Sequence, residues 1–154
     1  MAIGDSYQGG KVAYIDGTGL HGLIAAVADQ GTGTIWAVAP YQSTAVTGAD
    51  GTAIGTGNQN TIDIVAQNGA GSTFAAGLCS NLVEGGYSDW YLPSKDELAQ
   101  LYINRVAIGG FTTGNYWSSS EFIASGAWTQ YFSSANQLNA NKYNTSPVRA
   151  VRAF

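Results

Sequence analysis

Apolar residues near the start of the chain follow the pattern of paired β-strands. Residues 12–15 and 20–27 are rich in apolar and β-prone side chains, and the Asp-Gly-Thr-Gly sequence between them has turn composition. A third such run covers residues 34–38 and ends before Pro40. From there, the Gly-, Thr- and Ser-rich sequence of residues 41–60 predicts a long ordered loop. The pattern therefore indicates a hairpin, a third strand and a loop.

Apolar residues at helical spacing follow in the middle of the chain. Short helices are predicted over residues 61–67 and 74–83, and each is ended by glycines. The clearest helix is predicted over residues 95–104, because Ser94 and Glu97 at its start have the spacing of a capping box.

The last third of the chain returns to strand-like patterns. The strands predicted there cover residues 116–120, 127–132 and 147–154. Arg149 and Arg152 fall on opposite faces of the last of these strands. Because that strand is otherwise apolar, we expect both arginines to pair with carboxylates, and the candidate partners are Glu121 and Asp89.

Charged residues are scarce and unevenly distributed. They make up 10% of the 154 residues, where about 25% is typical, and the formal net charge is −4. Residues 1–98 carry two basic and nine acidic side chains, whereas residues 99–154 carry four and one. This balance argues against binding to nucleic acid or to an anionic membrane surface. No apolar run is long enough to insert into a membrane. The start of the chain lacks the pattern of a cleaved export signal, so either the protein is not exported by such a signal or the chain is a domain of a longer protein.

The residues that most enzymes and metal sites require are nearly absent. His21 is the only histidine and Cys79 the only cysteine, so a zinc site, a redox pair and a disulfide are excluded. We expect His21 to bond backbone near a turn, and Cys79 to be buried on the apolar face of its helix. No cofactor is expected, while a structural calcium ion held by Asp and backbone oxygens stays open.

Residues 115–147 have the composition of a binding surface. They include seven Ser, five Asn, three Tyr, two Thr and two Trp, with one Glu and one Lys as their only charges. Antibody loops likewise combine rigid Tyr and Trp contacts with adaptable Ser and Asn hydrogen bonds. The alternative, that such a sequence forms only solvated loops, stays open on composition alone.

Several motifs spread over nearly the whole chain resemble one family. They are GLHGLI at residues 19–24, TAIGTG at 52–57, GYSDWYLPSKDEL at 86–98, YWSSSE at 116–121, Ala127-Trp128, Asn141-Lys142 and VRAVRAF at 148–154. These motifs resemble C-type-lectin-fold domains of the family that includes the C-terminal domain of bacterial collagen-like adhesins and the variable proteins of diversity-generating retroelements.

The resemblance implies an α+β, C-type-lectin-like fold with small antiparallel sheets, two main helices and paired terminal strands. A single domain over residues 1–154 is expected. The helix predicted over residues 61–67 is additional to the two main helices of the family, and it is predicted from the residues alone. In retroelement-diversified relatives, variable residues derived from adenine-rich codons lie between the Trp-Ser-Ser motif and the terminal strand. The composition of residues 122–146 is similar.

The resemblance divides the last third of the chain into scaffold and contact residues. The implied scaffold comprises Trp117, Ser118, Ser119, Glu121, Ala127, Trp128, Phe132, Asn136, Lys142, Val148, Arg149, Val151, Arg152 and Phe154. The implied exposed contact set comprises Phe122, Ile123, Ser125, Gly126, Thr129, Tyr131, Ser133, Ser134, Asn139, Asn141, Tyr143, Asn144, Thr145 and Ser146. Ala135 departs from the Gly expected in its turn.

Three functions follow from the resemblance. The leading hypothesis is a non-enzymatic receptor or adhesion module, monomeric or trimeric, that binds a protein or glycan on a cell surface and is displayed on a virion or a microbial surface. The second is an adhesin domain that binds sulfated polysaccharide through Lys142, Arg149 and Arg152. The third is an enzyme of the formylglycine-generating type, which is disfavoured because that chemistry uses more than one cysteine.

Overall fold

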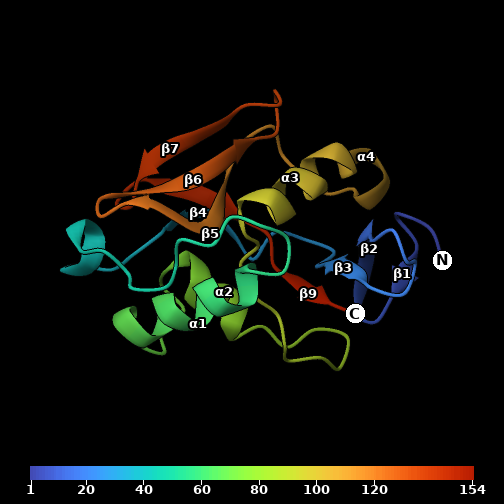
Figure 1. Cartoon of the computed structure of the whole chain (residues 1–154), viewed down its shortest axis with the longest axis horizontal. Coiled ribbons are helices and arrows are strands. Elements are labelled where there is room, and N and C mark those ends of the chain that lie inside the picture. Colours follow the sequence, from blue (N-terminus) through green and yellow to red (C-terminus); the bar gives the residue numbers. More distant parts are fainter.

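The computed structural model describes residues 1–154 and has the predicted α+β, C-type-lectin-like fold (Figure 1). The first strands are β1 (Ser6–Tyr7), β2 (Gly10–Ile15), β3 (Gly22–Ala25) and β4 (Gly31–Ile35), followed by a short 3-10 helix, η1 (Tyr41–Ser43). The helices are α1 (Gly57–Asn68), α2 (Ala75–Ser80), α3 (Lys95–Ile103) and α4 (Arg105–Ile108). The later strands are β5 (Asn115–Ile123), β6 (Gly126–Tyr131), β7 (Gln137–Asn141), β8 (Thr145–Val148) and β9 (Val151–Ala153).

The strands form three antiparallel sheets, in the orders β1-β2-β3-β9, β4-β8 and β5-β6-β7. The predicted hairpin and the predicted pairing of the terminal strands are confirmed, because β3 pairs with both β2 and β9. Both chain termini therefore lie at one end of the molecule, whereas β5-β6-β7 lies toward the other end (Figure 1).

Two strand predictions need correction. The strand predicted over residues 147–154 is divided into β8 and β9, because the chain leaves β4 and joins β3 between them. The strand predicted over residues 34–38 is observed as β4 and ends at Ile35, because Trp36 turns into the core and its indole donates a hydrogen bond to Ser118 O at 2.8 Å.

The predicted helices are all present, with shifted ends. At α3 the capping box forms, since Ser94 Oγ accepts from Glu97 N at 3.3 Å and the Glu97 carboxylate accepts from Ser94 N at 2.8 Å. Helix α1 begins earlier than predicted, at Gly57, where a larger side chain would collide with Glu97. Helix α2 is shorter than the predicted 74–83, because Asn81 turns away and its amide donates to Ser72 Oγ at 2.9 Å.

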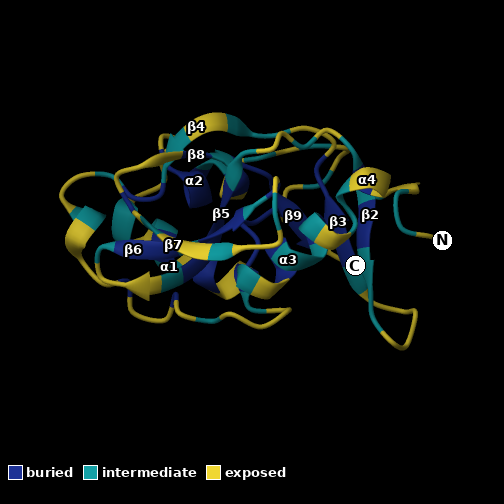
Figure 2. Ribbon diagram, turned by 90° about the horizontal axis from the view of Figure 1, so that it is seen from above, coloured by how far each residue is buried: buried dark blue, intermediate teal, exposed yellow.

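Two hydrophobic clusters form the core, and β5 supplies both of them. The larger cluster includes Trp36, Phe74 and Trp117, and the smaller one includes Tyr91 and Tyr116. Neighbouring residues of a strand point to opposite faces, so Tyr116 and Trp117 enter different clusters. Figure 2 shows β5 as a buried element in the middle of the molecule. None of the helices is long and apolar enough to span a membrane.

Candidate ligand-binding surface

The predicted contact set lies on the β5-β6-β7 sheet, on its two turns, on the loop from β7 to β8 and on the start of β8. The turn between β5 and β6 meets the β7–β8 loop, because Ser125 O accepts from Lys142 N at 3.0 Å. Tyr131, Ser133 and Ser134 lie at the opposite end of β6, around its turn into β7. The structure therefore brings most of the set together at one end of the sheet and leaves these three residues apart.

Three members of the predicted contact set are buried, which corrects the expectation that they are exposed. Gly126 is buried against Asn139, whose side chain occupies the space that a Cβ atom would need. The Thr129 hydroxyl donates to Leu138 O at 2.7 Å inside the sheet. Ser146 pairs with Thr34 between β8 and β4. Their burial comes from strand pairing, so these residues support the surface and do not form it.

One face of the sheet carries an aromatic group that the scaffold assignment of Trp128 missed. The half-buried Trp128 ring contacts the exposed Phe122 ring edge-on, with 4.8 Å between centroids. Lys95 Nζ lies 4.0 Å from the Trp128 ring centroid. Asn139 is directly opposite Trp128 in β7 and shares its face, as paired residues of antiparallel strands do. We call this group, Phe122, Trp128, Lys95 and Asn139, the Trp128 face.

A polar hollow lies beside the β7–β8 loop. It has a volume of about 490 Å³ and is lined by Asn115, Ala140, Tyr143, Asn144, Thr145 and Ser146. We call it the Tyr143 depression. Four of its six lining residues belong to the predicted contact set, and none is charged. Asn141 Nδ2 donates to Tyr143 Oη at 3.0 Å, which links the depression to β7.

Asn115 gives the Tyr143 depression an unusual polar group that was not in the predicted set. Its amide oxygen is buried and has no hydrogen-bond partner within the chain. Buried polar side-chain atoms in folded proteins nearly always have a partner. No local signal in the sequence distinguishes Asn115 from the other asparagines, because its surroundings depend on the β7–β8 loop folding over the start of β5.

A buried ion pair fixes the backbone next to the Tyr143 depression. Lys142 Nζ lies 2.7 Å from Glu121 Oε2 and also donates to Thr44 O at 3.0 Å. Glu121 Oε2 accepts a second bond, from Val46 N at 2.8 Å. The pair therefore ties the end of β5 and the β7–β8 loop to the segment that follows η1. Tyr143, the next residue along the chain, is 59% exposed.

The family model described as the Lcl C-terminal domain matches residues 25–152. The chain belongs to this family. No curated protein matches it. The family match covers most of the chain and confirms the predicted kinship at the level of the family.

The matched part of this Lcl C-terminal domain contains the whole candidate surface. It runs from the end of β3 into β9, and so includes the β5-β6-β7 sheet, Asn115 and the β7–β8 loop. Strands β1 and β2 precede the match, although they belong to the same sheet as β9. The Trp128 face and the Tyr143 depression are therefore features of the family's own region of the chain.

The three cations that were candidates for sulfate binding are held inside this Lcl C-terminal domain. Lys142 and Arg149 are fully buried, and Arg152 is 6% exposed. Arg149 pairs with Asp29 at 2.7 Å, which is neither of the two candidate partners, and Glu121 pairs with Lys142 instead. Arg152 pairs with Asp89 at 2.6 Å, as predicted, and this hydrogen bond lowers the pKa of Asp89. Each charge is already paired, which removes these residues as a surface for sulfated polysaccharide.

The residues considered for enzyme chemistry lie away from the candidate surface. Cys79 is fully buried in the larger hydrophobic cluster, and burial raises the pKa of its thiol well above the usual range. His21 lies on the β2–β3 turn, and its backbone oxygen accepts from Asp16 N at 2.8 Å. No group of three or more His, Cys, Asp or Glu side chains is arranged to hold a metal ion.

Proposed function

We propose that this Lcl C-terminal domain is a non-enzymatic binding module that recognises a protein or glycan on a cell surface. The proposed contact surface is the Tyr143 depression, and the Trp128 face is a second contact area on the same sheet. The observation that carries the proposal is that Asn115, whose buried amide oxygen has no partner within the chain, lines a depression together with four predicted contact residues. A rotation of the Asn115 side chain would turn this oxygen toward the depression, where a ligand hydroxyl or amide would supply the missing donor.

The distribution of charge supports a neutral polar ligand. The lining of the Tyr143 depression has no ionisable side chain except the Tyr143 phenol, and the nearby Lys142 is neutralised by Glu121. Exposed Tyr and Asn side chains offer a flat apolar ring together with hydrogen-bond donors and acceptors. Sugars and polypeptide backbones have the same mixture of apolar and hydrogen-bonding groups. The Phe122 and Trp128 rings add apolar area at the edge of the surface.

The rigid support beneath the surface favours binding without large rearrangement. Lys142, Glu121 and Thr129 are fixed by buried bonds, while Tyr143, Asn144 and Thr145 above them are exposed. Side chains held on a fixed backbone lose less conformational entropy when they bind. This arrangement also allows the exposed residues to vary without changing the supporting contacts.

The binding proposal is tested by substitutions in the Tyr143 depression. The intact chain is screened on glycan arrays and on arrays of cell-surface ectodomains, and affinity for a bound member is measured by surface plasmon resonance. Tyr143→Ala and Asn144→Ala should each weaken binding about ten-fold or more, as is common at the centre of an interface. Val83→Ala, after α2, and Val106→Ala, on α4, replace exposed side chains outside the predicted contact set; they are controls and should leave the affinity unchanged.

Unchanged affinity in both Tyr143→Ala and Asn144→Ala would contradict the proposed surface, and so would equal losses in the two controls. Urea unfolding of each variant separates loss of contact from loss of structure. The proposed function itself would fail if an array member were chemically converted by the chain.

We further propose that the exposed part of residues 122–146 is diversified by a retroelement, and that the domain is displayed on a virion or microbial surface. The motif resemblance and the separation of exposed from supporting residues support this. Sequencing the surrounding DNA provides the test. A nearby copy of the codons for about residues 115–150, differing mainly at adenines and adjacent to a reverse-transcriptase gene, is expected. Its absence would leave a binding module with one fixed ligand.

A further inference from the structure

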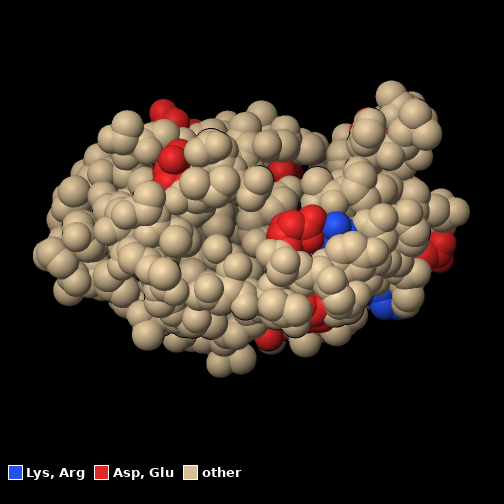
Figure 3. All heavy atoms as spheres, turned by 90° about the horizontal axis from the view of Figure 1, so that it is seen from below, with Lys and Arg blue, Asp and Glu red and all other residues tan.

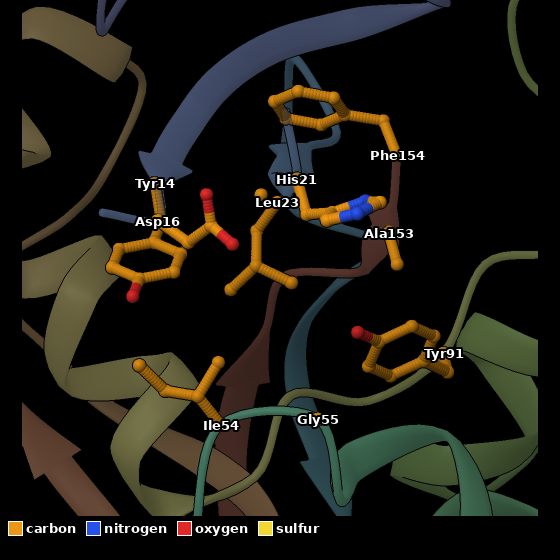
Figure 4. A pocket seen from close by; sticks show the side chains of 10 residues that line it. Tyr14, Asp16, His21, Leu23, Ile54, Gly55, Tyr91, Ala153 and Phe154 are labelled. Atoms are coloured by element: carbon orange, nitrogen blue, oxygen red, sulfur yellow. The ribbon is translucent and has the colours of Figure 1, made fainter. Parts of the chain in front are cut away.

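The β2–β3 turn projects from the end of the molecule where the chain terminates (Figure 2). A second hollow lies beside this turn (Figure 3). Its volume is about 280 Å³. The rings of Tyr14, Tyr91 and Phe154 line it together with the aliphatic side chains of Leu23 and Ile54 (Figure 4). We call it the Tyr91 pocket. Its walls come from β2, β3, β9, the segment before α1 and the segment before α3, and none of these residues belongs to the proposed binding surface.

A carboxylate stands at the rim of the Tyr91 pocket. Asp16 Oδ1 accepts from the Thr18 hydroxyl at 2.6 Å and from the backbone N–H groups of Thr18 and Gly19 at 3.0 Å each. The bond from the Thr18 hydroxyl lowers the pKa of Asp16, which is therefore ionised at neutral pH. These bonds all use Oδ1, and Oδ2 has no partner within the chain.

A second carboxylate lies directly behind the pocket wall. Glu97 is fully buried, and it accepts from Gly55 N at 2.8 Å and from the Tyr91 hydroxyl at 3.2 Å. Gly55 and Tyr91 both line the pocket. Glu97 takes part in none of the three ion pairs of the chain. Its hydrogen-bond donors are all neutral, and burial raises the pKa of this carboxyl group. Glu97 therefore brings no cation to the pocket wall, and the charge next to the pocket is that of Asp16.

The lining contains one histidine, His21, and no Lys or Arg to balance the Asp16 carboxylate. Aromatic ring faces carry negative electrostatic potential and attract cations, and the attraction increases where water is excluded. A hollow of this size can hold a small ligand or one end of a larger one. The ring faces, the Asp16 carboxylate and the absence of a Lys or Arg side chain together favour positive charge.

We propose that the Tyr91 pocket binds a small organic cation, namely an alkylammonium group of the choline or lysine side-chain type. The ammonium group lies against the Tyr14 and Tyr91 rings and faces Asp16 Oδ2. Its alkyl part contacts Leu23 and Ile54. This site is separate from the proposed ligand-binding surface, and either can fail without the other.

The proposal is tested by calorimetric titration of the intact chain at about pH 8 and low salt, conditions in which histidine side chains are in general uncharged. The probes are tetramethylammonium, choline, Nα-acetyl-lysine methylamide and the neutral choline-shaped alcohol 3,3-dimethylbutanol. Saturable binding is expected for the cations and none for the alcohol. A higher affinity for choline than for the lysine derivative would indicate that the pocket takes a free head group. The reverse order of affinities would indicate that it takes a lysine side chain of a partner protein.

Variants identify the site. Asp16→Asn keeps the Oδ1 acceptor of the turn and removes the charge, so cation affinity should fall about ten-fold. Tyr14→Leu keeps an apolar wall but removes a ring face and should weaken the cations further. Asp50→Asn is the matched control, because Asp50 is exposed and its side chain makes no hydrogen bond or ion pair. Equal binding of the alcohol, no saturable binding of any cation, or unchanged affinity in Asp16→Asn would overturn the proposal.

Discussion

Half of the residues that line the Tyr143 depression are exposed, whereas the Tyr91 pocket includes buried residues of paired strands. Tyr143 and Asn144 in the β7–β8 loop and Thr145 at the start of β8 are exposed to solvent. Tyr91, by contrast, is 4% exposed, and its backbone N–H donates to Val151 O at 2.8 Å. The loop can therefore change its chemistry at little cost in stability, while changes in the pocket affect the free energy of unfolding.

The largest expected loss in the free energy of unfolding is at Lys142, the residue directly before Tyr143. Lys142→Ala leaves the mostly buried Glu121 carboxylate without its cation. Removing one partner of a buried ion pair costs about 3–5 kcal/mol. Tyr143→Ala removes an exposed ring and should change the free energy of unfolding by less than about 0.5 kcal/mol. Urea unfolding of both variants measures the contrast. Similar losses in the two neighbours would break the distinction between support and surface.

A smaller effect on the free energy of unfolding is expected at Glu97, which hydrogen-bonds Gly55 and Tyr91 in the wall of the Tyr91 pocket. Burial raises the pKa of Glu97 in the folded chain, so the unfolded chain loses this proton first as the pH rises above the ordinary value of 4.5. Stability from this group is fully present below that value, and it is lost as the pH rises through the raised pKa. Glu97→Gln does not titrate, so its free energy of unfolding should lack this fall.

The measurement is a series of urea unfolding curves for the wild type and Glu97→Gln from about pH 4 to pH 8. The difference between the two proteins should shift in favour of the variant as the pH rises. A constant difference over this range would show that Glu97 ionises alike in the folded and unfolded chains.

The smallest expected effect on stability concerns three exposed residues of the β7–β8 loop and the start of β8, replaced together. Replacing Tyr143, Asn144 and Thr145 with Ser should change the free energy of unfolding by less than about 1 kcal/mol in total, because their side chains are exposed. The same variant should lose binding to the array ligand and keep the cation affinity of the Tyr91 pocket. Thermal unfolding and the two titrations measure these quantities. A large loss of stability would show that the loop supports the fold.

Local sequence signals predicted the parts of the fold that depend on neighbouring residues. The capping box of Ser94 and Glu97 marks the start of α3 correctly, and the Asp-Gly turn marks the β2–β3 hairpin. Strand β7 was not predicted, because its sequence, Gln-Leu-Asn-Ala-Asn, has low β propensity and is extended only through pairing with β6. The partner of Arg149 was also missed, because Asp29 lies 120 residues away.

The candidate surface could be located from composition, but its members could not be sorted. Gly126 and Ser146 belong to the same Ser-, Asn- and Gly-rich sequence as the exposed residues, yet strand pairing buries them. Trp128 is the only residue of β6 before Tyr131 that is not buried, and its exposure depends on how the sheet packs beside Lys95 of α3, which no local pattern reveals. The Asn115 amide oxygen lacks a hydrogen-bond partner because of tertiary packing, and no local sequence pattern predicts this.

The pairing of β3 with β9 also constrains how the chain folds as it leaves the ribosome. Strand β3 is synthesised early, but its partner Val151–Ala153 emerges only after nearly all of the other residues. Until then one edge of β3 is open, and an open strand edge is prone to pair with another chain. Closing contacts between residues so distant in sequence also slows folding. Nascent chains therefore depend on the last few residues to complete their first sheet, and ribosome stalling shortly before β9 would expose an aggregation-prone edge.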